Sequence, residues 1–533
     1  MTPGPEGDTT RATGPVGRVT VWVFLSALLL YVGTAGGSLT SSDASIAFDL
    51  TRNIVDHHSV ALSSNMPGST VNVGLDGRPY SQQGLGYSLY TIPFFLAGRA
   101  MEARFPHTPG PPDTITKATV AMSSTVAAAT AVAIVFAFAF ALSRDGRAAL
   151  LSAATAAAGS LLWPYATFGF NATLAAALLT ASAWTLWLGT ERHRTGLIGL
   201  AGLLVGALWL TRHEGLLIGI AGLAWLLASV DRTRLRSVVP AYLAGLAVGG
   251  TAWMAYNVSR FGTPFEVGHH PGYGGQGYLG LLVYPGASVF VYTPSIILGL
   301  GGLLLLARRG QGATAWLLGG PGLIHYAFVG ALEDWVGGRA YGPRYLVACL
   351  PLLAVAAVEV YGRPSPAPAA VSDRPRFARV LNRTAVPVLL ISSLLQLPGV
   401  LVDYSRVSFA WARAASPTAV SERLEHWRSS PLVLNVREAA TSVPRNLAIL
   451  AGRATPPPIV RDAGDQPGGF SQQFAFSLDF WWLYLVYLHV LPPAAGVAIG
   501  IGLILASLWA GRRAWRLGAA LSRSGAPMEH LAP

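Results

Sequence analysis

Long apolar stretches recur along the whole chain, and they constrain its fold more than any other feature. An α-helix rises 1.5 Å per residue, so about 20 apolar residues are needed to cross the hydrocarbon of a bilayer. The chain is 52% hydrophobic and only 12% charged, with a mean hydropathy of +0.46, whereas about 25% of the residues of soluble domains are charged. These features exclude a soluble globular enzyme and predict an all-α polytopic membrane protein.

The apolar stretches predict about twelve membrane-spanning helices. They cover residues 18–36, 117–142, 148–165, 171–189, 196–210, 215–230, 237–257, 289–307, 313–331, 343–361, 384–402 and 481–510. The first stretch follows Arg18 and also looks like a signal peptide, but its length and the later spans favour an uncleaved anchor. A further run of about 15 residues at 86–100 contains Pro93, which favours a helix lying in the membrane interface over a span.

The net charge of +12 suggests nucleic acid binding until its distribution is considered. With the N-terminus inside, the cytoplasmic segments hold 20 of the 37 Lys and Arg residues and 8 of the 25 Asp and Glu residues. The outer segments hold 17 of each, a net charge of zero. This asymmetry is the positive-inside pattern, and it predicts cytoplasmic termini and no nucleic acid partner. The richness in Arg, Ala and Gly is typical of a GC-rich bacterial genome, so we expect the bacterial inner membrane.

Long outer segments divide the chain into five predicted regions. These are a cytoplasmic tail at 1–17, a transmembrane domain at 18–402 with outer loops at 37–116 and 258–288, an outer loop or small cap at 403–480, a last span at 481–510 and a cytoplasmic tail at 511–533. Residues 362–383 contain five arginines and a Pro-Ser-Pro-Ala-Pro run, which predicts a flexible cytoplasmic connection.

Ionisable residues gather at the outer ends of the predicted helices, where charge near hydrocarbon is costly and usually functional. Asp43 follows Ser41 and Ser42 directly after the first span, so it either caps the helix that follows or takes part in chemistry. Asp49 and Arg52 are three residues apart, which predicts a surface ion pair.

The order of these features resembles the GT-C glycosyltransferase superfamily, particularly bacterial protein-mannosyltransferases and lipid A aminoarabinose transferases. The resemblance covers residues 18–361. It lies in the first span, the acidic outer helix, DGRPYSQQGLGYSL at 76–89, WPY at 163–165, TRHEG at 211–215, FGTPFE at 261–266 and WVGGRAYGPRY at 335–345. It implies periplasmic loop helices and an inverting transfer of a sugar from a polyprenyl phosphate donor to a protein, lipid or polysaccharide at the outer face.

The resemblance places the catalytic base at Asp43 and makes Arg344 the first choice for contact with the donor phosphate, because a guanidinium suits phosphate oxygens. The further substrate-binding candidates are Arg212, His213, Gln83, Arg339, Trp335, Tyr345 and Glu266. The chain departs from the family at Ala44, where a second acidic residue is common, at Gln83, where a lysine is common, and at Asn171, where we expect an acid.

Each of these residues also has an ordinary interpretation. Arg344 is equally typical of an arginine reaching the lipid headgroups, Arg212 and His213 of residues flanking a span, and Trp335 of an interfacial tryptophan. The histidine pairs 57–58 and 269–270 lack a carboxylate at ligand spacing, so they are expected to be hydrated loop residues. No cofactor is predicted, and a divalent cation beside Glu266 is left open.

Three functions are compatible with these patterns: a glycosyltransferase, a secondary transporter or lipid flippase, and a non-catalytic relative of the transferases. Transporters usually contain internal repeats and broken helices at the bilayer centre, whereas here no repeat is visible and the ionisable residues lie at helix ends. The sequence therefore favours the transferase and names neither the sugar nor the acceptor.

Overall fold

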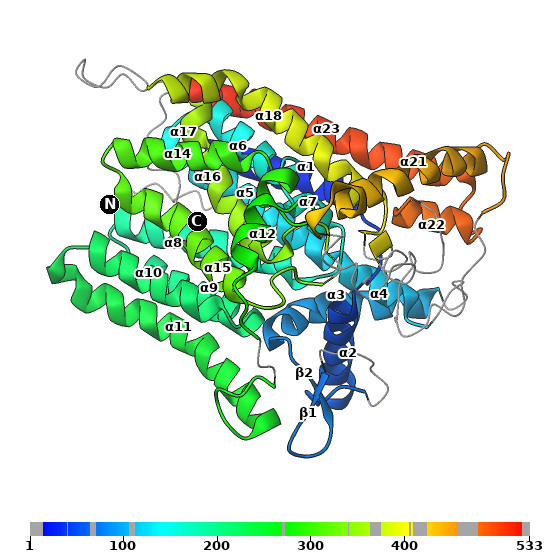
Figure 1. Ribbon diagram of the computed structural model, residues 1–533, viewed down its shortest axis with the longest axis horizontal. Helices are drawn as coiled ribbons and strands as arrows, with labels where there is room; N and C mark the ends of the chain where they lie inside the picture. The colour runs from blue at the N-terminus through cyan, green and yellow to red at the C-terminus, as the bar shows by residue number, and fades with distance from the viewer. Residues whose placement is uncertain are drawn as a thin grey trace, which may run out of the picture.

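The computed structural model describes residues 14–39, 41–63, 71–105, 112–268, 272–338, 340–362, 375–404, 407–408, 424–456 and 478–524. These ranges are mostly helical, and they contain one antiparallel hairpin of β1 (Val71–Val73) and β2 (Pro79–Ser81), with Val71 opposite Ser81 (Figure 1). The predicted all-α class is confirmed.

The helices follow one another with short connections. They are α1 (Pro15–Gly33), α2 (Ser42–His57), α3 (Leu85–Arg104), α4 (Thr114–Ala121), α5 (Ser123–Ser143), α6 (Gly146–Ala157), α7 (Leu162–Ala166), α8 (Asn171–Glu191), α9 (Thr195–Thr211), α10 (Gly215–Ser229), α11 (Arg232–Phe261), α12 (Gly277–Val283), α13 (Val289–Tyr292), α14 (Ile296–Arg308), α15 (Gly312–Ala331), η1 (Arg344–Cys349), α16 (Leu350–Ala356), α17 (Val358–Tyr361), α18 (Arg376–Leu401), η3 (Trp427–Ser429), α21 (Pro431–Leu450), α22 (Trp481–Tyr487) and α23 (Pro493–Ser524).

Seven helical segments in the described ranges are long and apolar enough to cross a bilayer, and the chain is a multi-pass membrane protein. They are Pro15–Gly33, Thr114–Ser143, Asn171–Glu191, Arg232–Phe261, Arg344–Tyr361, Arg376–Leu401 and Pro493–Ser522, and the three shorter apolar helices are α9, α10 and α14. The prediction of twelve comparable spans is therefore too high, because the lengths of apolar runs do not reveal where helices break.

The predicted span at 148–165 shows such a break. It is divided into α6 and α7 between residues 157 and 162. A carbonyl that leaves a helix inside a membrane needs another hydrogen-bond partner. The carbonyl of Gly159 has two, since the hydroxyls of Ser295 and Ser392 donate to it over 2.5 and 2.7 Å. Partners more than 130 residues away thus make the break stable, and no local pattern predicts them.

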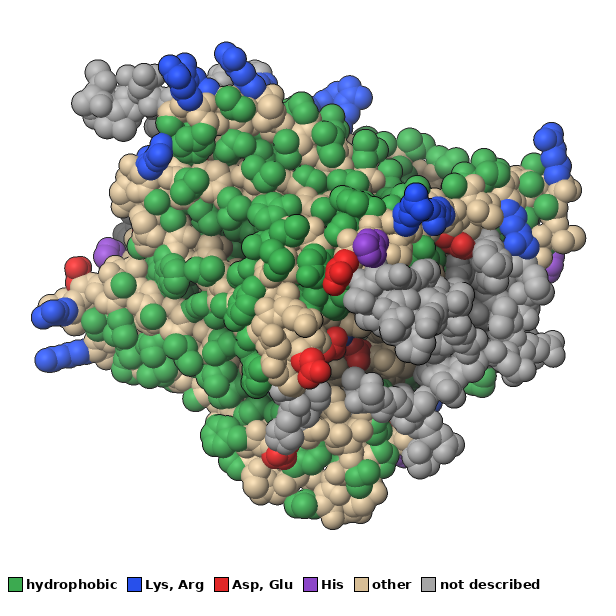
Figure 2. All heavy atoms as spheres, viewed as in Figure 1, with side chains coloured by type: hydrophobic (Ala, Val, Ile, Leu, Met, Phe, Trp, Pro, Cys, Tyr) green, Lys and Arg blue, Asp and Glu red, His purple; other side chains and the backbone are tan. Residues whose placement is uncertain are grey.

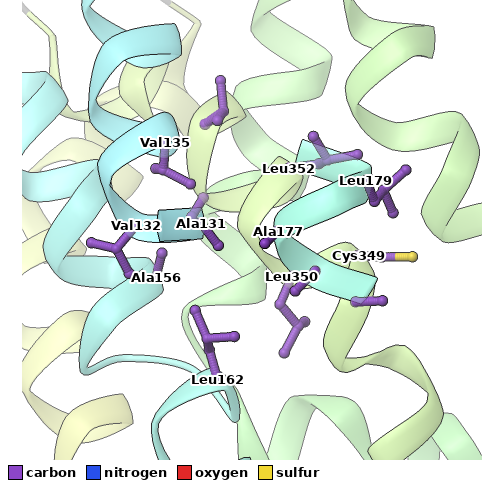
Figure 3. Packing of buried hydrophobic residues seen from close by; sticks show 14 of the residues in the cluster. Ala131, Val132, Val135, Ala156, Leu162, Ala177, Leu179, Cys349, Leu350 and Leu352 are labelled. Carbon is purple, nitrogen blue, oxygen red and sulfur yellow. The ribbon is translucent and has the colours of Figure 1, made fainter. Parts of the chain in front are cut away.

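Small side chains allow the helices to pack closely. α9 and α11 meet at glycines, and a Cβ added to Gly202 would lie 2.0 Å from the carbonyl oxygen of Tyr242. In the main core, residues of α5, α6 and α8 meet those of η1 and α16 (Figure 3). Such close packing of small residues stabilises helix contacts in membranes.

α2 and α3 lie beside the hairpin at one end of the helix bundle (Figure 1). The hydroxyl of Thr51 on α2 is 2.8 Å from that of Thr91 on α3, and the rings of Phe48 and Phe95 are 5.6 Å apart. α3 does not meet the length and hydropathy criteria for a span, and its placement in the membrane interface stays a prediction. These contacts fix α2, whose first turn carries Asp43.

Two predicted flexible segments are partly helical. α18 begins at Arg376, so the arginines at 376, 379 and 383 lie in a helix and not in a loose connection. α23 continues to Ser524, so the predicted tail at 511–533 begins as a helix. Within the outer segment 403–480, the structure describes η3 and α21.

Candidate active site

Asp43 lies in the first turn of α2 and is 5% exposed. The N-cap of this helix is Ser41, whose hydroxyl accepts the backbone N–H of Ala44 at 3.1 Å. The capping interpretation of Asp43 is therefore wrong. Its Oδ2 instead accepts a hydrogen bond from Nη1 of Arg344 at 3.1 Å, while Oδ1 makes no hydrogen bond within the described residues.

Arg344 stands at the first position of η1, 301 residues after Asp43 in the sequence. Its guanidinium carbon lies 5.1 Å from the ring centres of both Phe170 and Tyr345, and its Nε is buried without a hydrogen-bond partner. The side chain is 17% exposed. Arg344 thus turns inward to Asp43 and is not an arginine that reaches the lipid headgroups.

Glycines shape the backbone around Arg344. Gly337 has φ +72°, a conformation that favours glycine. A Cβ added to it would lie 2.6 Å from Nε of Arg344. The glycine therefore lets the loop approach the guanidinium closely.

A second charged group lies next to this pair. Nε and Nη2 of Arg212 are 2.6 and 2.5 Å from Oε1 of Glu214, and Nε2 of His325 is 3.5 Å from the same oxygen. Burial opposes the charge on Glu214, but Arg212 and His325 outweigh it and lower the pKa of this carboxyl below its usual value. The guanidinium of Arg212 lies 5.4 Å from the ring of Tyr345, which thus contacts both arginines.

Gln83 and His213 connect the first outer loop to this second group. Nη1 of Arg212 donates to Oδ1 of Asn171, whose Nδ2 donates to Oε1 of Gln83, both over 3.5 Å. Nε2 of His213 is 3.0 Å from the carbonyl oxygen of Gln82, and its Nδ1 accepts the indole N–H of Trp253 at 2.9 Å. The residues at the two places where an acid and a lysine are usual in the family, Asn171 and Gln83, therefore contact each other.

Other candidates lie apart from Asp43 and Arg344. Glu266 accepts the backbone N–H of Gly268 in the loop after α11. Trp335 packs on α12, where a Cβ on Gly280 would lie 2.1 Å from its ring. Arg339 lies outside the described residues.

The metal interpretation gains no support from the part of the chain that the structure describes. It contains no group of three His, Cys, Asp or Glu side chains placed to hold a metal ion. His57 and His58 are exposed, and the histidines at 269 and 270 lie outside the described residues. Asp49 and Arg52 form the predicted ion pair at 2.5 Å, but Asp49 is fully buried and also accepts two hydrogen bonds from Ser63.

Sequence reasoning missed Glu214, His325, Phe170 and Asp334. Asp334 precedes Gly337 in the same turn, and burial raises the pKa of its carboxyl although the nearby Arg344 lowers it. Glu214 stands in the TRHEG motif, where a carboxylate two residues after Arg212 is a signal for a local ion pair. Nothing in the sequence indicates that Phe170 and His325 lie close to them.

An apolar cavity of about 590 Å³ adjoins the charged groups. It lies between α14, α15 and the segment that begins at Arg344, and its lining includes Leu303, Leu323, Leu346 and Leu350. Leu346 is two residues from Arg344. A buried carboxylate, a guanidinium held by aromatic rings and an apolar cavity therefore meet at one end of η1.

No protein-family model matches the chain, and no curated protein matches it. In structure the chain is similar to two membrane glycosyltransferases of the GT-C type. ArnT from Cupriavidus metallidurans matches in the apo state with a TM-score of 0.47 and 14% identity over 95% of this chain and 76% of that one. ArnT bound to undecaprenyl phosphate matches with a TM-score of 0.47 and 13% identity over 91% and 88%.

The oligosaccharyltransferase of Archaeoglobus fulgidus, tethered with an acceptor peptide, matches with a TM-score of 0.47 and 14% identity. This match covers 70% of the present chain and only 54% of the archaeal one. At such scores and identities the function has to be inferred from the side chains of the site.

Proposed function

We propose that this protein is an inverting membrane glycosyltransferase that moves a sugar from a polyprenyl phosphate donor to an envelope acceptor at the outer face of a bacterial inner membrane. The observation that carries the proposal is the buried contact of 3.1 Å between Asp43 and Arg344. A carboxylate that keeps one oxygen free can accept a proton, and a guanidinium can bind a phosphate, so the pair supplies the two functions that this transfer needs.

The proposed reaction is a single displacement. The acceptor hydroxyl oxygen forms a bond to the anomeric carbon of the sugar, and its proton passes to Oδ1 of Asp43. The bond between the anomeric carbon and the phosphate oxygen breaks on the opposite face, and its electron pair leaves with the polyprenyl phosphate. One attack from the opposite face inverts the anomeric configuration. Asp43 later returns the proton to water.

Arg344 has two successive partners in this scheme. Without donor, its Nη1 contacts Asp43, and its Nε has no hydrogen-bond partner. An incoming phosphate competes with Asp43 for the guanidinium, because both are anions that accept its N–H groups. Donor binding thereby releases the carboxylate to act as a base and places the leaving group beside a cation.

Arg212 has a supporting part. Its Nε and Nη2 already contact Glu214, and its Nη1 contacts Asn171. A cation compensated by its own carboxylate attracts a phosphate less than Arg344 does. Arg212 therefore holds Tyr345, which stacks on Arg344, and the first outer loop through Asn171.

The apolar cavity supports a lipid-linked donor. It is lined almost entirely by aliphatic and aromatic side chains and lies two residues from Arg344. An isoprenoid chain buried there would leave its phosphate at the end of η1. A water-soluble nucleotide sugar would gain nothing from such a lining.

The test is to offer purified protein in nanodiscs a panel of polyprenyl phosphate sugars and to measure the release of polyprenyl phosphate. We expect release from one class of sugar and a loss of at least about a hundredfold with Asp43→Asn. Release from none of the donors, together with movement of lipid-linked sugar across the bilayer, would instead identify a flippase. Unchanged release with Asp43→Asn would overturn the assignment of the base.

A further inference from the structure

α21 is amphipathic in the opposite sense to a helix on a water-exposed domain. Asn435, Ser442 and Asn446 lie on its inner side and are at most 1% exposed. Val436 is 48% exposed and Leu447 is 61% exposed on the outer side. Helices at a protein–water boundary turn their apolar side inward. The reversed order indicates that the outer side of α21 does not face water.

The inner side is polar enough to be costly. Both side-chain polar atoms of Asn435 and Oδ1 of Asn446 have no hydrogen-bond partner in the described structure. Burying such groups opposes folding unless something else stabilises this orientation of the helix. Transfer of the outer side chains from water to hydrocarbon would do so.

Both ends of α21 are held against the transmembrane helices. The backbone N–H of Leu432 donates to the hydroxyl of Tyr292 on α13 at 3.1 Å. Near the other end, Ile449 packs with Leu483, Tyr484 and Tyr487 of α22. The helix is thus fixed at the end of the bundle, and its rotation about its own axis is defined.

The exposed side of α21 continues a surface that already faces lipid. α18 is long and apolar enough to span the membrane, and it packs against α21. Its exposed side chains include Leu390, Ile391 and Leu394, which are 54–63% exposed. In Figure 1 the two helices follow each other along the same edge of the molecule, and in Figure 2 hydrophobic side chains cover much of this edge.

Exposed arginines complete the pattern. Arg437 stands next to Val436, and Arg428 and Arg453 lie near the two ends of the helix, all exposed. Long cationic side chains can reach the phosphates of a headgroup layer while their neighbours stay in hydrocarbon. The arrangement has the character of a helix lying in the membrane interface.

We infer that α21 lies in the outer leaflet with Val436, Ala440 and Leu447 in the hydrocarbon and Arg437 at the headgroups. The partner of this face is bilayer lipid, and not the aqueous space above the membrane or a second copy of the chain. The inference does not depend on the proposed function. It corrects the idea of a water-exposed cap for this part of the segment 403–480.

Spin labelling tests the inference directly. Cys349 is the only cysteine of the chain and is buried, so Cys349→Ala gives a cysteine-free background. Single cysteines at Val436, Ala440 and Leu447 carry a nitroxide in nanodiscs of phosphatidylethanolamine and phosphatidylglycerol. Power saturation then compares collisions with oxygen, which concentrates in hydrocarbon, and with a water-soluble nickel chelate. Leu394→Cys on α18 is the lipid reference, and Thr263→Cys in an exposed loop is the aqueous reference.

We expect the ratio of oxygen to nickel collisions at the three α21 positions to approach that at Leu394. A ratio like that at Thr263 would place the helix in water and overturn the inference. Low access to both reagents would also overturn it, since the face would then be covered by protein. Thr441→Cys, at an exposed polar position of the same helix, replaces any variant that does not enter nanodiscs.

Discussion

Arg344 contacts residues from three distant parts of the chain: Asp43 on α2, Phe170 before α8 and Tyr345 beside it. A lysine at this position keeps the charge but loses the planar group that stacks on two rings and binds phosphate through two N–H groups. We therefore expect Arg344→Lys to weaken binding of polyprenyl phosphate and Arg344→Ala to weaken it further, as measured by titration in nanodiscs. Equal affinity in all three proteins would show that the phosphate binds elsewhere.

Glu214 is the residue whose loss should affect stability most. It compensates Arg212, and the two side chains are only 13% and 8% exposed. Removing one partner of a buried ion pair leaves an uncompensated charge, which costs about 3 kcal/mol or more. We expect Glu214→Gln to lower the midpoint of thermal unfolding in detergent clearly, and Arg212→Met with Glu214→Gln to recover part of the loss. A double variant no more stable than the single one would contradict this account of the pair.

At the scale of elements, the first turn of α2 decides where Asp43 points. Ser41 caps this turn, and replacing a capping serine by alanine costs about 1 kcal/mol. We expect Ser41→Ala to lower transfer while donor affinity stays the same, and Ser41→Asp, which also caps, to restore transfer. Failure of the aspartate to rescue would mean that Ser41 acts through something other than the cap.

Elements also show how far the sequence can be interpreted. The apolar runs predict most of the helices, because hydrophobicity over about 20 residues is a local property. The break at Gly159 depends on Ser295 and Ser392, and the contact of Asp43 with Arg344 joins residues 301 positions apart. The family resemblance predicts both members of this pair, whereas Glu214 and His325 come together only through the packing of α9, α10 and α15. Periodicity cannot reveal such long-range contacts.

At the scale of the whole molecule, the distribution of charge predicts one orientation in the membrane. Reporter fusions at Asp145, Arg234 and Arg376 should report the cytoplasm, because the positive-inside rule retains arginine-rich loops there. Fusions at Asp76 and Gly272 should report the outer face. A reproducible reversal at any of these positions would invert the site with respect to the membrane and remove the outward-facing acceptor from the proposal.

The central claim is that Asp43 is the base of a sugar transfer, and single-turnover transfer by Asp43→Asn tests it most directly. Asparagine keeps the size of the side chain and still accepts a hydrogen bond from Arg344, but it cannot take the acceptor proton. Glu266→Gln, in the loop after α11, is the matched control. The account predicts that Asp43→Asn slows transfer by at least about a hundredfold with donor affinity little changed, while Glu266→Gln stays near the wild type. Near wild-type transfer by Asp43→Asn together with loss of transfer by Glu266→Gln would contradict it and place the base in the second outer loop.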